Sequence, residues 1–412
     1  MRLREQLIPP AGPIRALVRA NLGRSVGNGI LVSLVVLFFV RSVGLPPGQL
    51  GIGLTIAAAV KILASVPTGH LVDVLGPRTS AVGFVSLQGL LVTGYTLADG
   101  FAGFVVAAAL VGVAEVAGES ARGALVAAVV AGGERVRARA YLRAVNNIGI
   151  SAGAVFGGVA LSIDSRAGYV SLLVACGLLF VASGLSYLAL PPVAPVGRGE
   201  RARWWAVLGD RPFVAASVIN AVLMMNAGIL TVALPIWIAA RTNAPAYVYS
   251  VILVVNTVMV VAFQVRMSRG AEDVMGGANA LRRCGVLLAV CCGLFALAAG
   301  QPAWLAVVLL GAGALVHVFG ELLYSAGSWA LAYELAPEHA HGQYQGMFGM
   351  SGNIGAMLTP VAATTLIVGA GWLGWLVFAV VLLGAGTAAP AVGKWALRTR
   401  QEPVAASNGG KS

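Results

Sequence analysis

Charged side chains are scarce in this sequence of 412 residues: Asp, Glu, Lys and Arg make up 10% of it, whereas 58% of the residues are apolar. An average soluble domain has about a quarter charged residues, which cover its surface. A chain with so few charges cannot build a water-facing globular surface. Soluble classes are therefore excluded, and the expected solvent is the lipid bilayer.

Cysteine and histidine are also rare, with four residues of each. The cysteines lie in or beside apolar runs, without the CxxC or His spacing of a metal or redox site, so we expect small packing residues. We expect no metal and no cofactor. A membrane enzyme would need clustered His, Asp or Cys, and a receptor would need a soluble output domain; neither is present. The cysteines are Cys176, Cys284, Cys291 and Cys292.

Apolar runs of about 20 residues, the length that a helix needs to cross a bilayer, recur along the chain. One connection, residues 191–211, has the Pro, Gly and Arg content of a linker. The sequence predicts an all-α membrane protein in which this cytoplasmic linker joins two six-helix bundles, at 21–190 and 212–390, with cytoplasmic segments at 1–20 and 391–412. The twelve expected transmembrane helices are 21–43, 49–72, 78–98, 101–130, 139–163, 168–190, 212–240, 245–266, 280–299, 303–335, 342–368 and 371–390.

Basic residues lie almost entirely on one side of this arrangement. The exceptions are Arg41, Arg166 and Arg241 on the other side and Lys61 inside a span. Because cytoplasmic connections carry the excess of Lys and Arg, both termini are expected in the cytoplasm. The net charge of +12 therefore reports topology and requires no nucleic acid. Arg outnumbers Lys 24 to 3, which suits a GC-rich bacterium and so a bacterial cytoplasmic membrane.

Short matches relate the two halves at fixed offsets. At an offset of 206, Glu115 falls on Glu321 and residues 147–149 fall on 353–355, both reading Asn-Ile-Gly. At an offset of 199, Gly29 falls on Gly228. Equivalent helices cross in the same direction, so the halves are predicted to be parallel repeats.

Residues 69–78 read GHLVDVLGPR, which resembles the G-x-x-x-D-x-x-G-x-R loop of the major facilitator superfamily of transporters. Gly69 permits close approach of two helices, Asp73 can face the positive N-terminal end of a neighbouring helix, and Gly76 can turn the chain. The resemblance implies a gating loop that latches the two halves in an outward-open state. Its residues are Gly69, Asp73, Gly76 and Arg78.

Residues 149–158 read GISAGAVFGG and resemble the G-x-x-x-G-P-x-x-G-G signature of the drug:proton antiporter branch, with Ala154 in place of Pro. The stretch 320–346 also resembles bacterial drug-efflux members. The glycines form a small-residue stripe on a helix, so a packing role explains them nearly as well as antiport. They are Gly149, Gly153, Gly157 and Gly158.

Charges inside predicted spans cost about 2.5 to 3.5 kcal/mol each on insertion scales, so they usually face a cavity. They are Lys61, Glu115, Glu119 and Glu321. The spacing of Glu115, Glu119 and Arg122 places all three on one helix face. A second polar stripe, expected to face the first across a pore, consists of His317, Glu321, Tyr324 and Ser328.

We expect Glu115 or Glu119 to carry a proton, because a desolvated carboxylate binds a proton more readily. Glu321 and His317 are candidates for a second titratable station. A structural alternative pairs Glu119 with Arg122 and Lys61 with one of the acids, so that these residues only hold helices in register; His317 can likewise be a packing residue. Further candidate hydrogen-bonding groups on the pathway are Arg24, Asn28, Asn226 and Asn256.

These observations predict a monomeric secondary transporter, driven by the proton gradient without a cofactor. The expected activity is efflux of small hydrophobic or amphiphilic compounds, such as a drug or secondary metabolite, by alternating access. The alternative is proton-coupled or facilitated uptake of a small nutrient such as a sugar or organic acid, because importers share the loop at residues 69–78.

Overall fold

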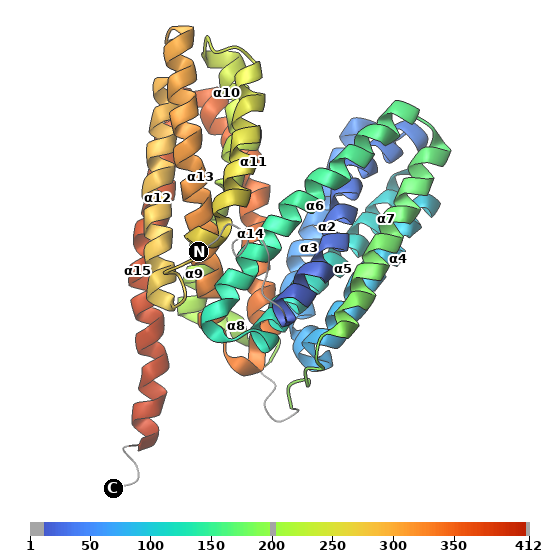
Figure 1. Ribbon diagram of the computed structural model, residues 1–412, viewed down its shortest axis with the longest axis vertical. Helices are drawn as coiled ribbons and strands as arrows, with labels where there is room; N and C mark the ends of the chain where they lie inside the picture. Colours follow the sequence, from blue (N-terminus) through green and yellow to red (C-terminus); the bar gives the residue numbers. More distant parts are fainter. Residues whose placement is uncertain (1–11, 198–202, 409–412) are drawn as a thin grey trace. The chain divides into compact units, whose positions relative to one another are not determined.

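The computed structural model of the protein describes residues 12–197 and 203–408, and these residues form helices and short connections (Figure 1). In the first half of the chain the elements are α2 Pro13–Leu37, η1 Phe38–Ser42, α3 Pro47–Leu75, α4 Pro77–Gly94, η2 Tyr95–Leu97, α5 Gly100–Val129, η3 Gly132–Glu134, α6 Arg135–Ile163, α7 Arg166–Ser186 and η4 Tyr187–Ala189. In the second half they are α8 Ala206–Gly209, α9 Arg211–Met224, η5 Ile229–Ala233, α10 Leu234–Arg241, α11 Tyr247–Met267, α12 Val274–Leu297, α13 Ala303–Glu334, η6 Glu338–Ala340, α14 His341–Ala362, η7 Ala363–Val368 and α15 Trp372–Asn408.

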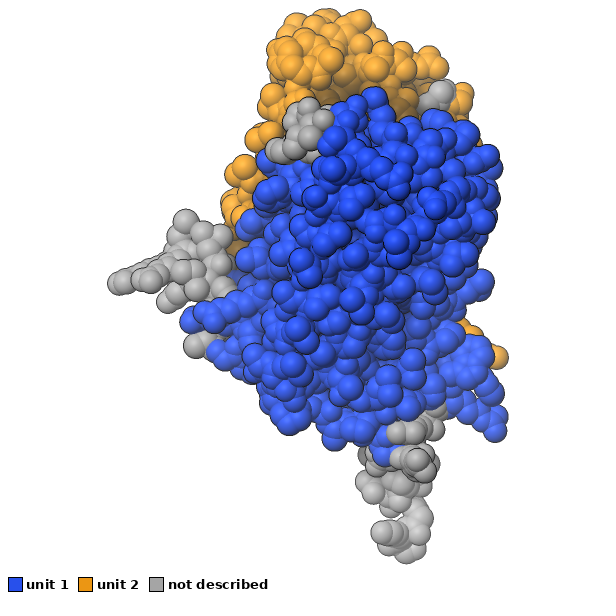
Figure 2. Space-filling view, turned by 90° about the vertical axis from the view of Figure 1, so that its right-hand side faces the viewer, with its two compact units in different colours: residues 1–131, 141–206, 336–350 blue, residues 132–140, 207–335, 351–412 orange. Residues whose placement is uncertain are grey.

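The chain forms two compact units, coloured separately in Figure 2. Unit 1 contains residues 1–131, 141–206 and 336–350, and unit 2 contains 132–140, 207–335 and 351–412. Each unit thus includes a short segment from the other half of the sequence. The two segments nearly coincide at the repeat offset of 206, so the exchange follows the internal repeat.

Helix pairs build each unit. In unit 1, α3 and α4 both pack on α5, and α7 packs on α4 and α2. In unit 2, α12 packs between α13 and α15, and the three run side by side in Figure 1. Buried aromatic side chains fill both interiors, for example Phe39 against Phe104 in unit 1 and Trp237 against Trp375 in unit 2.

Ten of the described helical segments are long and apolar enough to cross a membrane. Helices α6 and α14 are the long helices that do not meet this measure. The first turns of α6 are rich in arginine, and α14 begins with a polar sequence containing His341, Gln343 and Gln345. The protein is therefore a multi-pass integral membrane protein with ten clearly apolar spans.

Both ends of the helical region differ from prediction. Within the described residues, α2 begins at Pro13 rather than at residue 21, because proline at the first helical position is preorganised for a helix start. Residues 15–24 therefore belong to the helix and not to a preceding segment. Helix α15 includes Pro390 and continues to Asn408, so it does not end at residue 390 as predicted. The basic residues Arg2, Arg4, Arg198, Arg201 and Lys411 lie outside the described part of the chain.

The single helix expected at 212–240 is interrupted. Helix α9 ends at Met224, a turn follows, and the π-helical segment η5 leads into α10. Gly228 lies in this break, and backbone entropy makes glycine a weak helix former there. A π-helical segment also follows α2 and α14. A break of this kind frees backbone groups in the middle of an apolar span, where side chains must satisfy them.

Candidate functional site

Helices α3 and α5 are joined by an ion pair inside unit 1. Lys61 Nζ lies 2.9 Å from Glu115 Oε2, and the two side chains are 20% and 24% exposed. Gly112 lies one turn before Glu115, and a Cβ atom there would make an ordinary van der Waals contact, 3.5 Å, with Cβ of Lys61. The structural alternative proposed for Lys61, pairing with an acid, is thus present.

Glu119 lies one turn further along α5 and is more exposed. Its Oε1 atom is 3.7 Å from Nη2 of Arg122, so the pair is loose, and the Glu119 side chain is 41% exposed against 9% for that of Arg122. The predicted common face of α5 therefore holds two carboxylates and one cation, and α3 adds Lys61; Glu119 is the most exposed of the four side chains.

Arg24 is buried in α2 within a polar network that the sequence analysis missed. Its Nε donates to Oδ1 of Asn21 at 3.2 Å, and its Nη2 donates to Oδ1 of Asn146 at 3.1 Å. Ser25 also donates to Asn146. The one signal for this network is Asn146 beside Asn147 in a helix, where asparagine is a poor helix former. Asn28 is half-buried one turn beyond Arg24.

A second cluster lies in unit 2 where the seventh predicted span is interrupted. His317 Nε2 is 3.0 Å from the backbone oxygen of Asn226, and His317 Nδ1 is 3.9 Å from Glu321 Oε2. On α11, Asn256 donates its Nδ2 to the same carboxylate oxygen at 3.2 Å. Four residues predicted for the pathway are therefore brought together. His317 is fully buried, whereas the Glu321 side chain is 17% exposed.

Tyr324 belongs to a separate hydrogen-bonded group on the same helix. Its hydroxyl donates to Oδ1 of Asn220 at 2.8 Å, and Asn220 donates to Oγ of Ser351. Gln264 on α11 donates to Ser325. Ser328, the last member of the predicted stripe, is buried and donates to the backbone oxygen of Ser325. The α13 stripe thus divides into a titratable part and a neutral part.

The predicted gating residues do not form a loop, because α3 continues to Leu75. Gly76 alone joins α3 to α4 and has a φ of 89°, which favours glycine. Asp73 is buried in the last turn of α3. Its two carboxylate oxygens accept from the backbone N–H groups of Gly342 at 2.6 Å and Gln343 at 3.0 Å. The expected contact with a helix N-terminus is therefore present, at the start of α14.

Close packing supports this contact. A Cβ atom at Gly69 would overlap the carbonyl group of Gly342, and one at Gly342 would overlap that of Gly69. His70 and Gln343 are 2.9 Å apart through Nδ1 and Nε2. The fourth motif residue, Arg78 in the first turn of α4, donates to the backbone oxygen of Leu188.

Two short segments belong to the unit formed mainly by the other half of the sequence, 336–350 in unit 1 and 132–140 in unit 2, and we call them the exchanged segments. Segment 132–140 makes contacts of a different kind from those of segment 336–350. The guanidinium of Arg139 lies 3.9 Å from the ring centroid of Trp329 and also donates to the hydroxyl of Tyr333. Arg135 lies 3.9 Å from Glu334. Val136 is buried in an apolar cluster with alanines of α12 and α13. Arginine stacking, apolar burial and the contact between Arg135 and the Glu334 carboxylate hold this segment.

Three of the four glycines of α6 pack against α2. A Cβ atom at Gly149, Gly153 or Gly157 would overlap Ser25, the backbone oxygen of Val26 or Ser33, respectively. A Cβ atom at Gly158 would meet no atom within 4 Å. The stripe therefore has the packing role that its spacing allows.

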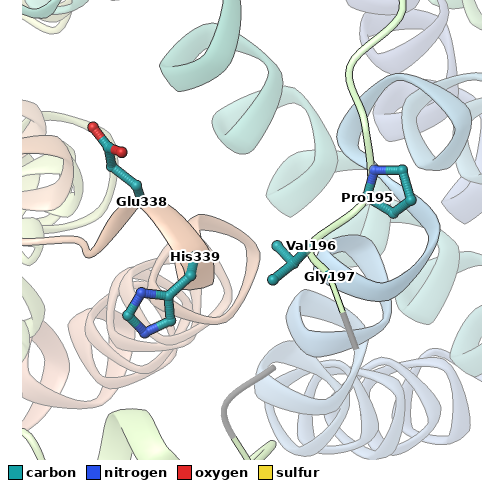
Figure 3. A pocket seen from close by; sticks show the side chains of 5 residues that line it. All are labelled: Pro195, Val196, Gly197, Glu338 and His339. Atoms are coloured by element: carbon teal, nitrogen blue, oxygen red, sulfur yellow. The ribbon is translucent and has the colours of Figure 1, made fainter. Parts of the chain in front are cut away.

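A cavity of about 550 Å³ lies within unit 1, outside these polar clusters (Figure 3). The connection after α7 provides Pro195, Val196 and Gly197, and η6 provides Glu338 and His339. In Figure 3 the carboxylate of Glu338 points away from Val196. None of its lining residues belongs to an apolar span, so this cavity is not the polar centre of the protein.

No group of three or more His, Cys, Asp or Glu residues with metal-binding geometry occurs in the part of the chain that the structure describes. The four cysteines are free thiols buried in the helices. The polar clusters described above consist of carboxylates, amides, hydroxyl groups, one histidine, one lysine and two arginines, a donor set suited to hydrogen bonding and proton binding rather than to a transition metal.

The sequence matches the Major Facilitator Superfamily over residues 20–360. No curated protein matches it. Three solved structures share the fold at 15% identity. The human organic anion transporter MFSD10 (TETRAN) has a TM-score of 0.67, and the match covers 94% of this chain and 100% of that chain. The transporter FucP in an outward conformation has a TM-score of 0.72, with 93% of this chain and 99% of that chain covered. A bacterial homologue of the iron transporter ferroportin in an outward-facing state has a TM-score of 0.68, with 97% of this chain and 100% of that chain covered.

Members of this superfamily are secondary transporters of small molecules and not enzymes. The match covers well over half of the chain, and polar clusters inside apolar helices are what solute transport requires. The chain therefore belongs to the major facilitator superfamily.

Proposed function

We propose that this transporter exports small hydrophobic or amphiphilic compounds, such as a drug or secondary metabolite, in exchange for protons. The observation that carries the proposal is the polar face of α5, where Glu115 and Glu119 lie one turn apart inside an apolar span with 24% and 41% of their side chains exposed. A carboxylate in this position can bind either a proton or a basic or hydrogen-bonding group of a substrate. Competition between the two couples their opposite movements.

Antiport is favoured by the resemblance of residues 149–158 to the antiporter signature, although its glycines also have a packing role. Arg24, Asn28 and Asn226 are proposed to provide hydrogen bonds along the pathway. No cofactor is needed, because a proton gradient supplies the free energy. The transporter is proposed to work as a monomer.

The proposed topology has twelve spans in two six-helix bundles, with both termini in the cytoplasm of a bacterium. It adds α6 and α14 to the ten apolar spans. Their polar first turns place arginines and amides at the cytoplasmic side, where basic residues are retained. Amide and histidine side chains within a membrane helix are tolerated where they face protein or a water-filled path.

The contact between Asp73 and the start of α14 is proposed to be a gate. Helix α14 begins in unit 1 and continues in unit 2. Its first turn must leave Asp73 if the remainder of α14 moves with unit 2 during alternating access. Charge-assisted hydrogen bonds from two backbone N–H groups would stabilise the state in which they are formed.

Uptake of a small nutrient is the second candidate. It is favoured by the similarity to FucP, which is described as a fucose:proton symporter and has a TM-score of 0.69 to this chain in a variant structure. Import would use the same carboxylates, with proton and substrate moving together rather than in competition.

Dye accumulation in cells tests export. Cells expressing the wild type should retain less of a lipophilic cationic dye such as ethidium than control cells, and an uncoupler should remove the difference. Glu115→Gln should abolish export. Asp164→Asn is a matched control, because this carboxylate lies at the end of a span in a loose pair with Arg41, 3.5 Å apart, with 44% of its side chain exposed.

Membrane levels of each variant must be compared with the wild type. Uncoupler-insensitive export by the wild type would contradict proton coupling. Normal export by Glu115→Gln would make the Lys61–Glu115 pair purely structural. Uncoupler-sensitive dye accumulation above the control level would favour import.

A further inference from the structure

Five charged side chains form one cluster inside the helices of unit 1, and the cluster is not neutral. Two ion pairs are present, between Lys61 and Glu115 and, more loosely, between Arg122 and Glu119. Arg24 is the fifth member, and it interacts electrostatically with both glutamates, as Lys61 does. Three cations and two carboxylates leave one positive charge in excess.

The other carboxylates of unit 1 are too near the helix ends to balance this charge. Among the described residues, each of them lies within one turn of a helix end or in a connection, and they are Asp73, Asp99, Asp164 and Glu338. Asp73 accepts from two backbone N–H groups, and Asp164 is paired with Arg41. A buried charge without a counterion is costly, so an anion bound within the cluster would stabilise it.

The two arginines are the groups with hydrogen-bond donors for such an anion. Nε and Nη2 of Arg24 donate to the amide oxygens of Asn21 and Asn146, which are neutral partners and use two of the five N–H donors of a guanidinium. Nη2 of Arg122 lies 3.7 Å from Glu119, which is longer than a hydrogen bond. Each guanidinium therefore has donors that these contacts do not use.

The two guanidinium groups also act on each other. Among single charges, Arg122 has the largest electrostatic effect on Arg24, and both side chains are buried. Like charges repel strongly where water is excluded, and a bound anion attracts both of them. Glu119, one turn before Arg122, is the most exposed carboxylate of the cluster. A ligand that reaches Glu119 thus meets Arg122 next.

We propose that the cargo of this transporter carries an acidic group, such as a carboxylate, sulfonate or phosphate, and that Arg24 and Arg122 bind this group. A positively charged or hydrogen-bonding group of the same molecule then lies at Glu119, where a proton competes with it. The favoured cargo is therefore an amphoteric compound rather than a simple cation. The inference rests on the proposed function and names the charge class of its cargo.

Rhodamine B and its ethyl ester are matched probes, because both carry the same cationic ring system and only the first has an ionised carboxylate. Fluorescence anisotropy measures the binding of each dye to purified protein in detergent, with protein-free micelles as the blank. The wild type should bind rhodamine B about tenfold or more tightly than the ester, since hydrogen bonds between a guanidinium and a carboxylate are charge-assisted.

Arg24→Gln and Arg122→Gln should each bring the ratio of the two affinities close to one, while the ester still binds. Arg41→Gln is the matched control and should keep the wild-type ratio, because this arginine is 58% exposed and lies at the end of a span. If a glutamine variant does not reach the membrane, the corresponding lysine variant replaces it. Lysine keeps the charge without the planar guanidinium, so the ratio should fall several-fold.

Equal wild-type affinities for the two dyes, or no binding of rhodamine B, overturn the proposal, as does an unchanged ratio in both arginine variants. Uncoupler-sensitive export of the ester by such a protein would leave the proposed function in place. Conversely, an arginine-dependent preference for rhodamine B in a protein without uncoupler-sensitive export would preserve this inference and contradict proton-coupled efflux.

Discussion

Helices α5 and α13 place a glutamate at the same position of the internal repeat but surround it differently. Glu115 pairs with Lys61 at 2.9 Å, whereas Glu321 faces His317 at 3.9 Å and accepts from Asn256. In unit 1 the charge opposite the glutamate comes from a lysine, whereas in unit 2 the neighbours of the glutamate are an imidazole and an amide. The comparison shows that the two halves of the repeat surround an equivalent glutamate with different side chains.

The first helix of each half shows a related difference. Gly29 lies in a continuous α2 and is pressed against the backbone of α6 at Ile150. Its repeat equivalent Gly228 lies in the break before η5 and is pressed against the side chain of Thr359. The two halves therefore place an equivalent glycine against different groups, the backbone of another helix in unit 1 and a threonine side chain in unit 2.

The largest effect is expected from Lys61→Met, which leaves Glu115 without its cation in an apolar span. Removal of one partner of a buried ion pair destabilises a protein by about 3–5 kcal/mol. His317→Gln should cost only about 1 kcal/mol, because it removes one neutral hydrogen bond. Thermal unfolding of the purified proteins in detergent gives both values.

The double variant Lys61→Met with Glu115→Gln is the control, because it removes both charges and should recover most of the lost stability. Equal losses for Lys61→Met and His317→Gln would contradict the distinction between an ion pair and a hydrogen-bonded histidine.

Gly153→Ala should have the next largest effect, since the added methyl group would overlap the backbone oxygen of Val26, which cannot move independently of α2. Overpacking of this kind costs about 1–3 kcal/mol. Gly158→Ala, in the same motif, meets open space and should leave the unfolding temperature unchanged. Equal effects of the two substitutions would show that the contact between α2 and α6 does not limit stability.

Asp73→Asn should have a moderate effect on the first turn of α14. It exchanges one charged acceptor for a neutral one, and hydrogen bonds to charged groups contribute about 1.5–3 kcal/mol. Hydrogen–deuterium exchange at the amides of Gly342 and Gln343 should therefore become faster. Exchange in segment 132–140 should stay unchanged, since that segment belongs to unit 2 and Asp73 to unit 1. Unchanged exchange at both amides would remove the basis for a gate at Asp73.

The sequence predicted the helical membrane fold and most helix positions, because apolar length and polar breaks are local properties. It also predicted, from the preference of a carboxylate for a positive helix end, the meeting of Asp73 with a helix N-terminus. The span 212–240 is confirmed as the apolar segment Arg211–Arg241, but its interruption after Met224 was missed, because apolar composition does not reveal a break. The Arg24 network was missed for a different reason: Asn146 lies on another helix, far along the chain, and only packing brings it to Arg24 and Asn21.

The predicted α13 stripe illustrates both the strength and the limit of periodicity. Helical spacing placed His317, Glu321 and Tyr324 on one face, but not their partners. Asn226 and Asn256 come from other helices, and the tautomer of His317 follows only from contact with a backbone oxygen. Whether a glutamate is permanently paired or titratable is thus a property of tertiary structure.

The smallest effect is expected at the second exchanged segment, through Arg139→Lys. Lysine keeps the charge but lacks the planar guanidinium that lies over Trp329, and a cation–π contact at a partly exposed site contributes about 0.5–1 kcal/mol. Because Val136 remains buried, the segment should stay in place, and exchange at residues 132–140 should rise only a few-fold.

Trp329→Leu removes the same contact from the other side and should produce the same rise. Adding it to Arg139→Lys should then give no further increase, since both changes remove one interaction. A rise as large as that of the α14 amides in Asp73→Asn would mean that the two exchanged segments are held equally strongly, and the contrast between a carboxylate contact and a stacked arginine would have no energetic basis.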